Sequence, residues 1–139
     1  MKESAVIKVP SDPKYLGIIR SVSHKICEIS GMSDSETEDI KHAVDEACSN
    51  VIKYACRGDS TQQITVRFKI TDKVFEVNIE DRGIKAEPES IRGRDLDDVR
   101  PGGLGVHFIR KAFDVAEFDD EMKEGNRLRL IRYRRDNGK

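Results

Sequence analysis

The longest regular hydrophobic pattern in the chain runs from about residue 33 to residue 55. Its apolar residues repeat at the three- and four-residue spacing of one buried helix face. They are Ile40, Ala43, Val44, Ala47, Cys48, Val51, Ile52 and Ala55. Ser33 is followed three residues later by Glu36, which is the pattern of a capping box. We therefore predict a long helix that begins after Ser33 and ends near the turn at residues 57–59.

Shorter patterns predict the other elements. Asp12 and Pro13 are typical of a helix start, and the apolar face that follows extends from Tyr15 to Ile29. Alternating apolar residues predict strands, and short turns join two pairs of them into antiparallel hairpins. The predicted strands are residues 5–9, 64–70, 74–80, 115–118 and 128–133, and a third helix covers residues 104–113.

The order of these elements predicts an α+β fold. We expect a two-layer sandwich of about five strands in one mixed, mostly antiparallel sheet, with the helices on one face. A length of 139 residues suits one domain, residues 1–139. Residues 84–101 show no sustained period and contain Pro88 and Gly93. We interpret this stretch as a loop long enough to be a lid.

Composition narrows the function classes. The formal net charge is -1, so nothing steers the whole chain toward nucleic acid, and we interpret the arginines from Arg127 to Arg135 as the outer face of an edge strand and its tail. No signal peptide and no membrane-length apolar run is visible, which favours a cytoplasmic protein that does not bind membranes. The three cysteines lack metal-ligand spacing, and we expect them to pack in the core.

Three motifs contain candidate functional residues. Glu46 and Asn50 are four residues apart on the long helix, so they project from one side of it, at the border of the buried face. Asp81 and Gly83 follow directly where a strand leaves the core. Residues 100–105, Arg-Pro-Gly-Gly-Leu-Gly, open the third helix, where bare backbone N–H groups and the helix dipole favour a phosphate.

These three motifs, in this order, resemble the nucleotide-binding boxes of the GHKL ATPase superfamily. Within it, the short chain and the run from Gly102 to Asp114 look like the anti-sigma factor serine/threonine-protein kinases of the RsbW and SpoIIAB type. The resemblance covers roughly residues 7–133. It implies a Bergerat-type ATPase fold that binds ATP with Mg²⁺ between the helices and the sheet.

The resemblance assigns a role to each motif. It implies that Asn50 is the Mg²⁺ ligand and Glu46 the general base that accepts the proton of a serine hydroxyl. Asp45 is a rival acid, but it points about a third of a turn away. Asp81 would accept a hydrogen bond from the exocyclic amine of adenine, and Gly83 would let the backbone pass beside the base.

The glycine-rich turn would hold the phosphates through Gly102, Gly103, Leu104 and Gly105. Arg100 ranks first as a further phosphate contact, ahead of Arg110 and Lys111. The chain departs from the family pattern at Tyr54, where many relatives carry a histidine. It also departs near residues 125–128, where relatives often have a threonine that helps to hold the nucleotide.

The resemblance implies a protein serine kinase that sequesters a sigma factor and phosphorylates a STAS-type anti-anti-sigma protein, acting as a homodimer. A second hypothesis is a nucleotide-gated binding module in which no phosphate moves, and Glu46 separates the two because a pure binder needs no base. A third, a fragment of a histidine kinase, lacks the helical hairpin with a phosphoacceptor histidine that should precede such a domain.

Overall fold

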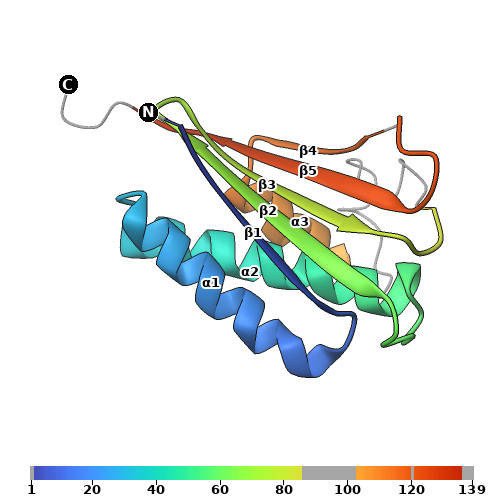
Figure 1. Cartoon of the computed structure of the whole chain (residues 1–139). Coiled ribbons are helices and arrows are strands. Elements are labelled where there is room, and N and C mark those ends of the chain that lie inside the picture. Colours follow the sequence, from blue (N-terminus) through green and yellow to red (C-terminus); the bar gives the residue numbers. More distant parts are fainter. Residues whose placement is uncertain (1, 86–102, 120, 136–139) are drawn as a thin grey trace.

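The computed structural model describes residues 2–85, 103–119 and 121–135. It has two layers, an open sheet and a set of helices that covers one face of that sheet (Figure 1). This is the α+β sandwich that the sequence predicts. Arg100 and Gly102, and the predicted lid apart from Ile84 and Lys85, lie outside the described residues.

The sheet has five strands in the order β1-β2-β3-β5-β4, and each neighbouring pair is antiparallel. The prediction of a mostly antiparallel sheet is therefore confirmed, and no parallel pair occurs among the described strands. Consecutive strands form the two predicted hairpins, whereas β3 pairs with β5 across an intervening helix and strand. The strands are β1 (Lys2–Pro10), β2 (Gln63–Thr71), β3 (Val74–Asp81), β4 (Val115–Phe118) and β5 (Asn126–Tyr133).

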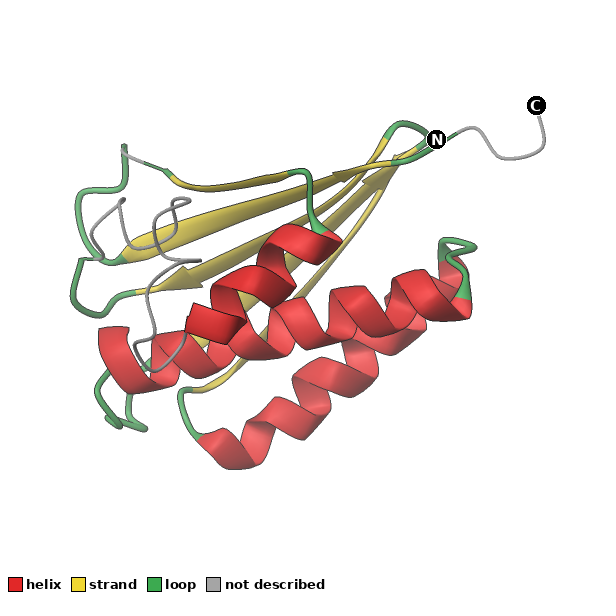
Figure 2. Ribbon diagram, turned by 180° about the vertical axis from the view of Figure 1, so that it is seen from behind, coloured by secondary structure: helices red, strands yellow, loops and turns green. Residues whose placement is uncertain are grey.

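The helices lie together on one side of the sheet (Figure 2). The predicted capping box is present at the start of α2, where Ser33 accepts from the Glu36 N–H and Glu36 accepts from the Ser33 N–H. Asp12 caps the short turn before α1. The helical elements are η1 (Pro13–Tyr15), α1 (Leu16–Ile29), α2 (Asp34–Asn50), η2 (Val51–Ala55) and α3 (Gly103–Ala112).

The core lies between the two layers. Alternate residues of β2 and β3 supply its sheet side, and the predicted apolar face of α2 supplies its central helix side. Ile29 does not belong to this core, because it ends α1 with 62% of its surface exposed. The largest fully buried side chains are Phe68, Phe75, Ile19, Ile40, Ile64, Ile79, Ile109 and Leu130.

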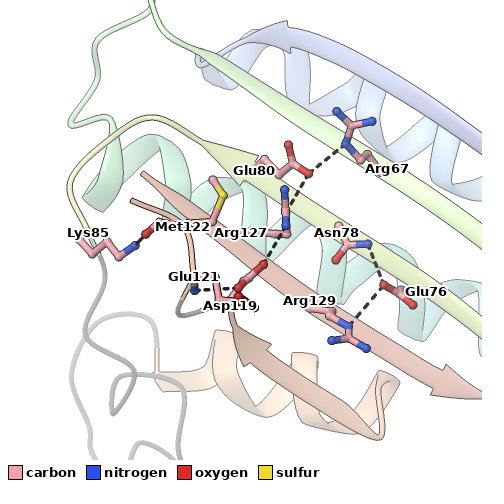
Figure 3. Close-up of polar contacts among 10 residues, drawn as sticks. All are labelled: Arg67, Glu76, Asn78, Glu80, Lys85, Asp119, Glu121, Met122, Arg127 and Arg129. Atoms are coloured by element: carbon pink, nitrogen blue, oxygen red, sulfur yellow. Dashed lines mark hydrogen bonds and ion pairs between the residues drawn. The ribbon is translucent and has the colours of Figure 1, made fainter. Parts of the chain in front are cut away.

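The interpretation of the last strand as an edge strand is wrong, because β5 lies between β3 and β4. Arg127 and Arg129 of this strand instead pair within the sheet, whereas Arg132 donates to Glu36 of α2. On the face opposite the helices, Glu80 accepts from both Arg67 and Arg127, and Glu76 accepts from Asn78 and lies 3.5 Å from Arg129 (Figure 3). Acids of the neighbouring strand β3 therefore neutralise the charges of Arg127 and Arg129.

Candidate nucleotide-binding site

Glu46 and Asn50 lie on the same flank of α2, one turn apart, and both are half-buried. Neither side chain makes a hydrogen bond or ion pair with a residue that the structure describes. Glu36 and Asp39 of the same helix do have partners, since Glu36 accepts from Arg132 and Asp39 lies 3.5 Å from Lys111. A half-buried carboxylate and amide without partners are suited to a ligand.

Asp45, the rival acid, has a different environment. Its Oδ1 lies 2.6 Å from Nη1 of Arg20, so the Asp45 side chain faces α1. The ion pair holds the Asp45 carboxylate on the side of α2 that faces α1. This side is opposite to α3, since α1 and α3 flank α2 on opposite sides (Figure 2). The geometry supports the choice of Glu46 over Asp45 as the acid that faces a substrate.

The end of α2 widens into a π-helix directly after Asn50. The Cys56 N–H donates to the Val51 carbonyl, five residues earlier, at 2.8 Å. The Ala55 carbonyl then accepts from the Ile84 N–H at 2.8 Å, which attaches the segment after β3 to this helix end. A Cβ at Gly83 would lie 2.2 Å from the Ala55 oxygen, so only glycine fits this close approach.

Asp81 is buried at the end of β3, with 4% of its surface exposed, directly opposite Asn126 of β5. Its Oδ1 accepts from the Gly83 N–H at 2.7 Å and from Asn126 Nδ2 at 3.0 Å. Burial raises the pKa of the Asp81 carboxyl above its ordinary value, and the hydrogen bonds from Asn126 and Gly83 lower that pKa in part. Asp81 is therefore a buried acceptor held by two donors.

The sequence did not identify Asn126 as a partner of Asp81. Asn126 is 5% exposed, and its Nδ2 also donates to the Ile84 carbonyl at 2.9 Å. The preceding Gly125 has a φ of 67°, and a Cβ there would lie 2.0 Å from the Asp81 carbonyl oxygen. A glycine before an asparagine at a strand start was the available signal, but the partner depends on the pairing of β3 with β5.

The N-terminus of α3 is directed toward Glu46 and Asn50. Near the C-terminal end of α3, Lys111 lies beside Asp39, and one turn earlier Phe108 contacts the His42 ring edge-on with centroids 5.7 Å apart. Residues one turn closer to the start of α3 therefore lie beside residues one turn closer to the end of α2. By this antiparallel alignment, the helix start at Gly103 lies alongside the part of α2 that carries Glu46.

The structure brings together most of the predicted site. Asp81 and Gly83 lie at the end of α2, which carries Asn50, and the backbone of Gly103, Leu104 and Gly105 forms the first turn of α3. Lys111 lies at the opposite end of α3, where it pairs with Asp39, so it is not at the helix start where the phosphates are predicted to bind. Tyr54 lies in η2 and is 53% exposed.

The residues present fit a magnesium nucleotide. The described residues contain no group of three or more His, Cys, Asp or Glu side chains that could hold a metal alone. Mg²⁺ in phosphotransfer sites takes one or two protein ligands and completes its octahedron with water and phosphate oxygens. The Asn50 side chain, without a partner among the described residues, fits that role.

In the described part of the chain, no helix is both long and apolar enough to cross a membrane.

Known proteins share this sequence pattern. Residues 9–132 match the family described as histidine kinase-like ATPase domain. The serine-protein kinase RsbW of Bacillus subtilis (strain 168) is 31% identical over 117 residues, covering 78% of this chain and 72% of the relative. RsbW of Listeria innocua is 30% identical over 122 residues, covering 82% of this chain and 78% of the relative.

Solved structures share the fold. The RsbU and RsbW domains of Rv1364c from Mycobacterium tuberculosis superpose on 94% of this chain with a TM-score of 0.65 and 19% identity, and the match spans 32% of that longer chain. The histidine kinase domain of an Erythrobacter litoralis blue-light activated histidine kinase covers 88% of this chain and 60% of its own, with a TM-score of 0.52 and 17% identity. The resemblance found in the sequence is confirmed, and the chain belongs to the histidine kinase-like ATPase domain family.

Proposed function

We propose that this protein is an ATP-dependent protein serine kinase and anti-sigma factor. It holds a sigma factor and transfers phosphate from ATP to a serine of a STAS-type anti-anti-sigma protein. The observation that carries the catalytic part is Glu46, a half-buried carboxylate without a partner among the described residues, one turn from Asn50. The relatives named serine-protein kinase RsbW support the choice of reaction.

Each residue of the site has one task in this proposal. ATP is the phosphoryl donor, and bound Mg²⁺ would supply charge neutralisation at the phosphates. Asn50 contributes a neutral oxygen ligand to the metal, and the backbone N–H groups at the start of α3 donate to the phosphates. Asp81 accepts from the adenine amine, and Glu46 takes the proton of the serine hydroxyl. We also propose a cytoplasmic homodimer.

Glu46→Gln tests the catalytic step. Glutamine keeps the volume and still contacts the serine hydroxyl, but it accepts no proton at neutral pH. Nucleotide binding should survive, while phosphate transfer falls about 10²- to 10⁴-fold, the contribution of a positioned base. The measurement is radiolabel transfer from ATP to the anti-anti-sigma protein of the same organism, run beside a sigma-factor binding assay.

Asp45→Asn is the matched control, because it makes the same change at the neighbouring position. The Arg20–Asp45 pair is substantially exposed, so its loss should cost less than about 1 kcal/mol of unfolding free energy and leave transfer near the native rate. If the native protein transfers no phosphate while ATP still controls partner binding, the protein is a nucleotide-gated binding module and not a kinase. Equal transfer by Glu46→Gln and native protein would exclude Glu46 as the base.

A further inference from the structure

The two oxygens of the Asp81 carboxylate have unequal environments. Oδ1 accepts two hydrogen bonds, from Gly83 N at 2.7 Å and from Asn126 Nδ2 at 3.0 Å. Oδ2 has one long contact, 3.4 Å from the same Asn126 nitrogen, and no other hydrogen bond from a described residue. A carboxylate oxygen accepts about two hydrogen bonds. The protein therefore saturates Oδ1 and leaves Oδ2 as the oxygen for a ligand.

We propose that Asn126 is a specificity-determining residue that holds Asp81 as a fixed hydrogen-bond acceptor. The site then favours a base with an amino group at that position and disfavours a base with a carbonyl group there. The inference rests on the proposed ATP site and deepens it, because it assigns nucleobase selection to the pair of Asp81 and Asn126. Asn126 is a positioning residue here. It acts through the Asp81 carboxylate and is not required to contact the base.

Two contacts give Asn126 this role. Its Nδ2 donates to Asp81 and to the Ile84 carbonyl, so one amide joins the acid to the segment that follows β3. The backbone pairing of Asp81 with Asn126 fixes the distance between the two side chains. An amide nitrogen directed at the carboxylate stabilises its ionised form, which accepts and never donates. Only a protonated carboxyl could donate to a 6-oxo purine.

Among the residues that the structure describes, no cation is placed to take over this task. The pKa of Asp81 is governed by burial and by the hydrogen bonds from Asn126 and Gly83. Arg82 is the next residue, but its side chain is 79% exposed and pairs with Glu124 at 3.5 Å. Burial raises the pKa of the nearby Cys56 thiol, so this group stays neutral beside Asp81. The ionisation of Asp81 therefore depends on its two neutral donors.

The test compares ATP with inosine triphosphate, which carries the same triphosphate and a 6-oxo group in place of the amine. The ratio of the two dissociation constants is measured by calorimetry between pH 4 and pH 8. This ratio does not depend on the fraction of folded protein, so a partly destabilised variant still reports it. The variants are Asn126→Asp, which keeps the shape and removes the donor, and Asn126→Ala.

The native protein should prefer ATP at neutral pH and lose that preference as the pH falls through the raised pKa of Asp81. In Asn126→Ala the loss should begin at a higher pH, because one donor to the ionised carboxylate is gone. Asn126→Asp places two carboxyls together, so that one retains a proton, and the preference at pH 7 should fall about tenfold or more.

Asn78 provides the matched control, since it is another buried asparagine of the sheet, 4% exposed, whose Nδ2 donates to the Glu76 carboxylate at 2.9 Å. Asn78→Asp makes the same change on the opposite face of the sheet and should leave the ATP preference and its pH profile unchanged. ATP preference with the same pH profile in native protein and both Asn126 variants would overturn this inference alone. A native protein that binds no ATP would refute the proposed site, and this inference with it.

Discussion

Gly83→Ala is the substitution whose effect the geometry defines most closely. An added Cβ would lie 2.2 Å from the carbonyl oxygen of Ala55 and 2.4 Å from its carbonyl carbon. Both are backbone atoms of the π-helix η2, so neither can rotate away as a side chain would. The two segments must separate by roughly 1 Å before this contact reaches van der Waals distance.

That separation has a second cost. The next residue, Ile84, donates its N–H to the same Ala55 carbonyl at 2.8 Å, and moving the segments apart lengthens this hydrogen bond. Overpacking costs about 1–3 kcal/mol and a lost hydrogen bond about 0.5–1.5 kcal/mol. We expect Gly83→Ala to lower the free energy of unfolding by about 2–4 kcal/mol and to weaken ATP binding, because Asp81 accepts from the Gly83 N–H.

Urea denaturation followed by circular dichroism measures the change, with Gly17→Ala as the control. Gly17 lies inside α1, and a Cβ there would meet only the tip of Arg20, at 3.6 Å. Alanine is favoured over glycine in a helix by about 0.5–1 kcal/mol, so this control should be more stable than the native protein. An unfolding free energy of Gly83→Ala within about 0.5 kcal/mol of the native value would refute the claim that the close approach fixes this residue.

Two further predictions concern the metal and the cysteines. Asn50→Ala should stay folded and lose the magnesium-dependent part of its ATP affinity; calorimetry with and without magnesium checks this, and an unchanged magnesium effect would exclude Asn50 as the ligand. Burial raises the pKa of Cys27 to about 12 and that of Cys48 far above its usual range, so neither should react with a thiol reagent at pH 8 until the protein is denatured, as absorbance titration would show.

Local signals explain why the sequence predicted the elements. The capping box at Ser33 and Glu36, the apolar face of α2 and the two hairpins all depend on residues close together in the chain, and each is confirmed. Glu46 and Asn50 share a flank for the same reason, because a separation of four residues fixes their direction on any helix. These contacts need no knowledge of how distant segments meet.

Contacts between distant segments were not predictable in the same way. β3 pairs with β5 although a helix and a strand lie between them in the sequence. This pairing places Asn126 opposite Asp81 and makes β5 an interior strand. The role of Gly83 likewise depends on the π-helix at the end of α2, which the apolar periodicity does not distinguish from an ordinary helix. That Gly83 lies beside the base stays a prediction, and the structure shows in addition that this glycine lies against the Ala55 carbonyl.

The fixed position of α2 explains how Glu46 and Asn50 could be held ready for chemistry. At its C-terminal end, η2 is attached to the segment after β3 through the bond from Ile84 to Ala55. Near its N-terminal end, Arg132 of β5 donates to the Glu36 carboxylate at 3.1 Å.

Arg132 also donates to the Ala112 carbonyl at the end of α3, at 2.8 Å, so one guanidinium joins the sheet to both helices. The Ser33 N–H and Arg132 hold the pKa of Glu36 below its usual value, which keeps this acid charged and the link intact at neutral pH. With both ends attached, α2 cannot shift along its axis without breaking hydrogen bonds to the sheet. The proposed base and the proposed metal ligand on this helix keep their spacing before any ligand arrives, and that spares the reorganisation that a flexible site would require.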